Sequence, residues 1–289
     1  MTYSLATKLM IVNVSIAVWE GRKLDRGVTD KTLRDNNISE ADALRVNKLL
    51  ISKDAFKEVQ AASSAIRNFV RDRTLPWKDN GDRALMRQGY QLFMLDFSTL
   101  KDTWTAAVDR FVGELYPAEV AKATFRLADA YDANDYPHPE ELRGKFRLTL
   151  DIDAVAEPDD FRVTLDQGDV EAIQASMKDA LEQRVHAAMK DVWSRVATMV
   201  DHYVARTSPD IQRFHDTTVT NMQELVGLMP SLNLIGDPDL KALTRRLKAT
   251  LCQYDPKDLR KDKDVRAAAN AEAAQIMEDM KGFMSAFGA

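Results

Sequence analysis

The fold of this chain is decided by DVEAIQASMKDALEQRVHAAMKDVWSRVATMVDHYVAR, residues 169–206. Apolar side chains recur in it every three or four residues, at Val170, Ile173, Met177, Leu181, Val185, Ala188, Val192, Val196, Met199 and Tyr203. The nine steps average 3.67 residues, the period of a nearly straight helix with at most a slight right-handed supercoil. At 1.5 Å per residue this helix is about 55 Å long, so we expect it to be the spine against which other helices pack.

Helical patterns also occupy most of the remaining chain. The predicted helices are 53–73, 88–115, 117–131, 210–229 and 238–254, followed by an Ala-rich helix at the C-terminus. Pro117 and Pro238 suit the first position of a helix, and Asp237 is the expected N-cap before Pro238. The charged segment YDPKDLRKDKDV, residues 254–265, is interpreted as a break.

Three short runs alternate apolar and polar residues, which is the pattern of a strand with one buried face. They are residues 8–19, 146–153 and 161–165. The last two flank AVAEPDD, whose Pro158 favours a loop, so we expect a hairpin that the first run extends. The sequence thus predicts an α+β fold, predominantly α: a long antiparallel helical bundle or coiled-coil spine with a small three-stranded antiparallel sheet. We expect an α+β core at 1–229 and a C-terminal helical appendage at 230–289.

Composition limits the classes of function. The 289 residues carry a formal net charge of −5, which provides no general attraction to nucleic acid. A single cysteine excludes an internal disulfide and fits a reducing compartment. The apolar run from Leu9 to Trp19 is about half the roughly 20 residues that a membrane span needs, and no signal peptide is recognisable. We therefore expect a cytoplasmic protein that does not enter a membrane.

The charges are unevenly distributed along the chain. Residues 129–169 hold 12 acidic and 4 basic residues, whereas residues 241–266 hold 9 basic and 4 acidic ones. Such segments are usually solvated surface, but opposite charges on one chain would also favour self-association into a homo-oligomer.

The patterns that carry catalysis or cofactors are missing. No Gly-rich phosphate-binding loop occurs, and GRKLDRG, residues 21–27, lacks the middle glycine of a dinucleotide fingerprint. His186 and His202 are 16 residues apart on one helix and face opposite ways. The acidic residues between 151 and 166 lack EF-hand spacing, and Cys252 has no histidine near it in sequence. We therefore expect no catalytic site, cofactor or metal.

Two sets of residues remain candidates for binding. Basic side chains and one aromatic could contact single-stranded nucleic acid; these are Arg22, Lys23, Arg26, Arg67, Arg71, Arg73, Trp77 and Lys78. Apolar residues of the C-terminal helix could dock a protein partner, because Met-rich faces adapt to partners, although they are equally often core; these are Met277, Met280, Phe283, Met284 and Phe287.

The segment TLPWKDNGDRAL, residues 74–85, could be a ligand loop or a corner between two helices. Pro76 ends the preceding helix and Asn80-Gly81 provides a tight turn. We predict a structural corner in which Trp77 closes the end of the bundle and Arg83 binds loop carbonyls.

Six stretches resemble an uncharacterised family encoded mainly by tailed bacteriophages. They are VNVSIAVWEGRKLDRGVTDK, TLPWKDNGDR, DANDYPHPEELRGKFRLTLDI, DDFRVTL, LMPSLNLIGDPDL and YDPKDLRKD, in this order along the chain. Genes of this family often lie near a MoxR-like AAA+ ATPase. The resemblance implies a phage protein that acts in the cytoplasm of the bacterial host, with an AAA+ ATPase as a candidate partner. It brings no catalytic residues.

The function expected from the sequence is therefore that of a non-enzymatic interaction or scaffold protein, which binds protein partners and itself. The alternative is a single-stranded DNA-binding or annealing protein.

Overall fold

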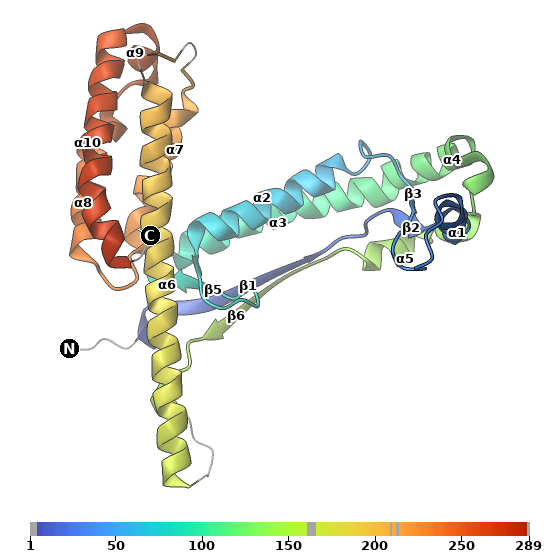
Figure 1. Ribbon diagram of the computed structural model, residues 1–289, viewed down its shortest axis with the longest axis horizontal. Helices are drawn as coiled ribbons and strands as arrows, with labels where there is room; N and C mark the ends of the chain where they lie inside the picture. Colours follow the sequence, from blue (N-terminus) through green and yellow to red (C-terminus); the bar gives the residue numbers. More distant parts are fainter. Residues whose placement is uncertain (1–4, 161–165, 209, 212–213, 288–289) are drawn as a thin grey trace. The chain divides into compact units, whose positions relative to one another are not determined.

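The computed structural model describes residues 5–160, 166–208, 210–211 and 214–287 (Figure 1). Within these residues the chain is mostly helical and forms two compact units. Unit 1 comprises Met1–Asn13, Arg71–Phe93 and Asp151–Ala289, and unit 2 comprises Val14–Val70 and Met94–Leu150. Residues 230–289, expected as an appendage, thus belong to the same unit as the long helix. No helix of the described residues is both long and apolar enough to cross a membrane.

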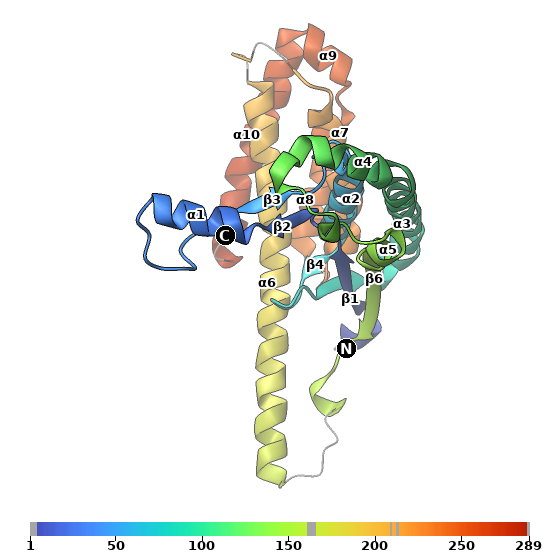
Figure 2. The ribbon, with the colours of Figure 1, turned by 90° about the vertical axis from the view of Figure 1, so that its right-hand side faces the viewer.

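The long helix of unit 1 confirms the predicted one nearly to the residue. It is α6, Gln167–Thr207, and its buried face follows the predicted spacing from Ala188 onward. The other helices of the unit are α7 (Thr217–Leu232), α8 (Pro238–Ala249), α9 (Pro256–Lys261) and α10 (Lys263–Phe287). α10 runs antiparallel beside the second half of α6 and makes its most extensive contacts there (Figures 1 and 2). α7 packs on α6 as well. The expected coiled-coil spine is not found: the described residues instead form a short helical bundle around half of α6.

The sheet is larger than predicted. The predicted strands at 8–19 and 146–153 are confirmed as β1 (Leu9–Ala17) and β6 (Arg147–Ala154), whereas residues 161–165 lie outside the described residues. The sheet has the order β4-β5-β1-β6, because β4 (Leu75–Pro76) and β5 (Arg83–Met86) form a hairpin beside β1. A second sheet consists of β2 (Arg22–Leu24) and β3 (Asn47–Leu49). The expected three-stranded sheet is therefore wrong. The sequence does not reveal β2 to β5, because strands of two to four residues are too short to show an alternating pattern.

The β4–β5 hairpin is the segment predicted to be a corner. Gly81 takes the positive φ of 94° that its turn requires, and the Asp82 carbonyl accepts a hydrogen bond from the Trp77 amide at 3.1 Å. Trp77 is 5 % exposed and belongs to the same core as α6. Arg83 donates to the carbonyls of Arg71 and Thr74, at 3.2 and 3.0 Å, as predicted for loop carbonyls. The segment is thus structural, but it extends the sheet.

Unit 2 is built around aromatic side chains. Its helices are α1 (Arg26–Asp35), α4 (Tyr116–Leu127), α5 (Pro139–Gly144) and most of α2 (Lys57–Arg73) and α3 (Tyr90–Arg110). The ring clusters contain Trp19, Phe56, Phe111, Tyr116 and Phe146. A π-helical turn, Phe111–Leu115, joins α3 to α4, so the two helices expected separately follow each other without an intervening loop. Pro117 explains the turn, because a proline removes one helical hydrogen bond and displaces the carbonyl four residues earlier.

A buried carboxylate fastens the β2–β3 ribbon to the rest of unit 2. Lys23 and Lys48 are directly opposite each other in the ribbon, and both ammonium groups lie 2.5 Å from the carboxylate of Asp135. Like charges opposite each other destabilise a sheet, so Asp135 neutralises a repulsion that the register imposes. Its side chain is 2 % exposed, that of Lys48 is 15 % and that of Lys23 is 50 %.

Candidate functional site

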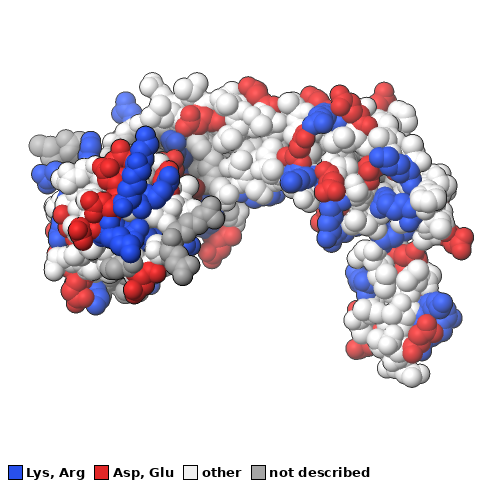
Figure 3. Space-filling model, turned by 90° about the horizontal axis from the view of Figure 1, so that it is seen from above, with Lys and Arg blue, Asp and Glu red and all other residues white. Residues whose placement is uncertain are grey.

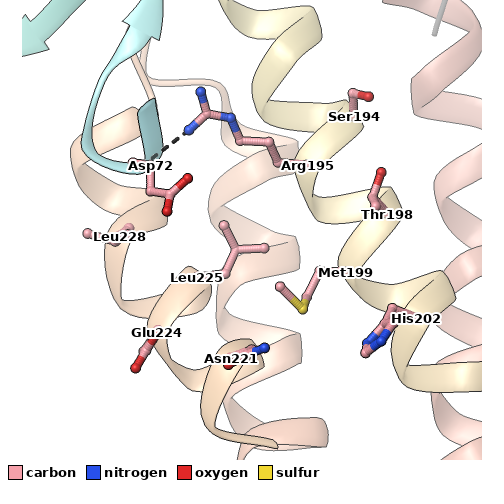
Figure 4. Close-up of a pocket in the computed structure, with 10 residues that line it drawn as sticks. All are labelled: Asp72, Ser194, Arg195, Thr198, Met199, His202, Asn221, Glu224, Leu225 and Leu228. Carbon is pink, nitrogen blue, oxygen red and sulfur yellow. Dashed lines mark hydrogen bonds between the residues drawn. The ribbon is translucent and has the colours of Figure 1, made fainter. Parts of the chain in front are cut away.

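An open groove of about 620 Å³ lies between α6 and α7 in unit 1 (Figure 4). Its lining residues are Asp72, Ser194, Arg195, Thr198, Met199, His202, Asn221, Glu224, Leu225 and Leu228. The lining residues of α7 are 221, 224, 225 and 228, and those of α6 are 194, 195, 198, 199 and 202, so in both helices they recur every three or four residues. Each set therefore forms one stripe of its helix. The groove follows directly from two helices that touch along adjacent stripes.

The floor of the groove is apolar and partly exposed. Met199 and Leu225 lie across the space between the two helices, with Leu228 one turn further along α7 (Figure 4). All three pack against the core of unit 1 without being fully covered. Burying such side chains under a partner is favourable, at about 25 cal/mol per Å² of apolar surface.

Arg195 forms a rigid wall at one end of the groove. Its guanidinium donates to the carbonyls of Asp72 and Thr74 at 3.2 and 3.0 Å, and lies 2.6 Å from the Asp191 carboxylate. The last carbonyls of α2 have no hydrogen-bond donor within the helix. The Arg195 guanidinium supplies donors to them, and its positive charge interacts favourably with the negative end of the helix dipole. Arg83 donates to the same Thr74 carbonyl, at 3.0 Å. Burial, with Arg195 beside it, lowers the pKa of Arg83 from its usual value.

The rim of the groove is polar and open to a partner. Ser194, Thr198, Asn221 and Glu224 are exposed, and the described residues offer Glu224 no salt bridge. Ser194 and His202 are eight residues apart on α6, or about 12 Å, which is too far for a nucleophile and its base. In the described part of the chain no three His, Cys, Asp or Glu side chains are gathered as metal ligands. Burial raises the pKa of the Cys252 thiol, which disfavours the reactive thiolate.

The predicted nucleic-acid residues are divided between the two units. Arg22, Lys23, Arg26 and Arg67 belong to unit 2, whereas Arg71, Arg73, Trp77 and Lys78 belong to unit 1. The Trp77 ring is buried, so no base can stack on it in this conformation. Lys23 is engaged by Asp135, and the Lys78 ammonium is 3.5 Å from the Asp82 carboxylate. On the face seen in Figure 3, basic and acidic side chains are interspersed.

The predicted docking residues all lie on α10. Met280 is 1 % exposed in the core of unit 1 and Met277 packs partly against that core. The side chains of Phe283, Met284 and Phe287 lie outside the described residues. The described part of this face therefore belongs to the fold of unit 1, where α10 packs on α6.

Sequence reasoning missed the groove although it predicted both helices that form it. The residues at 221, 224, 225 and 228 do form a mixed polar and apolar stripe, which the sequence displays. No family model, no curated protein and no solved structure matches the chain.

Proposed function

We propose that this protein is a non-enzymatic interaction protein that binds a helical segment of a partner protein in the α6–α7 groove. The observation that carries the proposal is the partly exposed floor of Met199, Leu225 and Leu228 between two helices. A Met- and Leu-lined groove is the surface that an amphipathic helix recognises, because its apolar residues at i, i+3 or i+4 and i+7 fit between such side chains.

The rim specifies the chemistry of the partner. Glu224 is exposed on the α7 side, so the partner helix should carry a lysine or arginine beside its apolar stripe. Asn221, Ser194 and Thr198 can exchange hydrogen bonds with its polar side chains. The phage origin, the host cytoplasm and an AAA+ ATPase as the partner remain proposals that rest on the resemblance of the sequence.

Replacing Leu225 by Glu should weaken capture of the partner at least tenfold. The substitution places a second carboxylate beside Glu224 and removes apolar floor, and we expect a loss of at least tenfold in affinity, or about 1.4 kcal/mol. Ile235→Glu is the matched control, because Ile235 is an exposed apolar residue of unit 1 outside the groove. Affinity purification from the cells in which the protein acts, with and without nuclease, measures the difference.

The outcome separates the two functions. The proposal requires a protein that is lost with Leu225→Glu, retained with Ile235→Glu and indifferent to nuclease. If the wild type instead binds a labelled single-stranded oligonucleotide with strong salt dependence, and Leu225→Glu changes nothing, the protein is a nucleic-acid binder. A thermal melt of each variant shows whether unit 1 is intact.

A further inference from the structure

The first half of α6, residues 167–187, carries an apolar stripe that the rest of unit 1 leaves partly exposed. The stripe consists of Val170, Ile173, Met177 and Leu181. Among the described residues, the 3-10 turn Pro158–Asp160 lies beside this half, and the β4–β5 turn residues Lys78 and Asp79 lie beside its end, near Ala180 and Arg184. The stripe has the same 3.67-residue spacing as the buried half of α6, so it is suited to packing against another helix.

The start of this half is acidic, whereas residues 178–187 hold two basic and two acidic residues. Residues 166–177 contain Asp166, Asp169 and Glu171 but no lysine or arginine. Arg184, seven residues after this range, and Lys78 line a hollow of about 250 Å³ that Met177 and Leu181 also line. Lys78 shares its charge with Asp82, whereas neither Arg184 nor Asp169 has a salt bridge within the described residues.

We propose that the first half of α6 pairs with the same segment of a second copy, antiparallel and about a two-fold axis at Met177. This arrangement sets Ile173 against Leu181 of the second copy and brings Asp169 to the level of Arg184. Both charged residues lie on the same side of the stripe, and an antiparallel two-fold pair brings matching sides together. The two Asp169–Arg184 contacts then border a continuous apolar seam.

Charge argues for this direction over the parallel one. A parallel pair would place the acidic start of α6 against itself, with like charges at every level. In the antiparallel pair each Asp169 instead lies at the level of Arg184 of the other copy. The proposed seam lies outside the α6–α7 groove, so it does not depend on partner binding there.

Reversing one charge of each contact gives a test that only this arrangement passes. In the Asp169→Arg variant, two arginines face each other in both contacts. In the Arg184→Asp variant, two aspartates face each other in both contacts. Each variant alone should therefore be a monomer. Mixed in equal amounts, the two should form a heterodimer, because every contact then joins opposite charges. Analytical ultracentrifugation measures the masses, and we expect at least a tenfold weaker association for each variant alone.

Asp179→Arg is the matched control, since Asp179 is exposed on the opposite side of the same helix and should leave the dimer intact. A monomeric wild type, a dimer that survives both reversals, or a mixture that stays monomeric would each overturn the proposal. A Met177→Cys variant with Cys252→Ser provides an independent measurement. It should oxidise to a disulfide-linked dimer, whereas Asp179→Cys in the same background should not.

Discussion

Replacing Asp237 by Ala is expected to lower the free energy of unfolding of unit 1 by about 3 kcal/mol. The Oδ1 atom of Asp237 caps α8 by accepting from the Asp239 and Leu240 amides, at 2.8 and 3.3 Å. Its Oδ2 atom accepts from the indole N–H of Trp193, a fully buried side chain of α6, at 3.2 Å. Loss of the cap costs about 1 kcal/mol, and a buried indole N–H without an acceptor costs about 2 more.

The chain contains its own control for this prediction. Asp255-Pro256 begins α9 with the same motif as Asp237-Pro238, and Asp255 accepts from the Lys257 amide at 2.7 Å. Asp255 is exposed and has no indole beside it, so Asp255→Ala should cost only about 1 kcal/mol. Urea unfolding followed by far-UV circular dichroism measures both values.

A third variant separates the two contributions at Asp237. Asn caps helices as well as Asp does, but its amide group would oppose the indole N–H, so Asp237→Asn should keep the cap and lose the Trp193 bond. We expect a loss of about 2 kcal/mol, between the other two variants. Equal losses for Asp237→Ala and Asp255→Ala would mean that the buried bond contributes nothing.

These two motifs also show how far the sequence determines the structure. Local chemistry predicted the cap at Asp237 and the start of α8, because both depend on neighbouring residues. The identical motif at Asp255 lies in a segment that the sequence alone suggests is a charged break, because α9 has six residues with one buried side chain, Leu259, and therefore shows no helical period. That Trp193 would reach Asp237 could not be predicted, because the contact joins α6 to a residue 44 positions away.

The same limit applies to the sheet and to the groove. β1 and α6 were predictable because each repeats its pattern over many residues. β4 and β5 owe their existence to pairing with β1, and a hairpin of such short strands has little stability alone. The groove exists only once α6 and α7 are in contact, so its two stripes were visible in the sequence while their pairing was not.

Asp135→Asn should destabilise unit 2 by about 2–3 kcal/mol, since removing one partner of a buried ion pair leaves charge uncompensated. The change keeps the shape of the side chain but leaves Lys23 and Lys48 facing each other across the β2–β3 ribbon. Hydrogen exchange should therefore accelerate at the amides of β2 and β3. Asp30→Asn is the control, because Asp30 is an exposed residue of α1 in the same unit.

The effect of Asp135 should also depend on pH in a defined direction. Burial opposes its ionisation, but the ammonium groups of Lys23 and Lys48 outweigh it and hold the pKa of Asp135 below the usual 3.8. A carboxylate whose pKa is lower in the folded state than in the unfolded state stabilises the fold when the pH is above the unfolded-state pKa. This contribution disappears as the pH falls through the folded-state pKa. The gap in unfolding free energy between wild type and Asp135→Asn should thus be full at neutral pH and shrink below pH 3.8. Adding Lys48→Met to Asp135→Asn should recover part of the loss, because it removes one of the two opposed charges. A gap in unfolding free energy that stays constant with pH would show that the carboxylate charge is not what stabilises the ribbon.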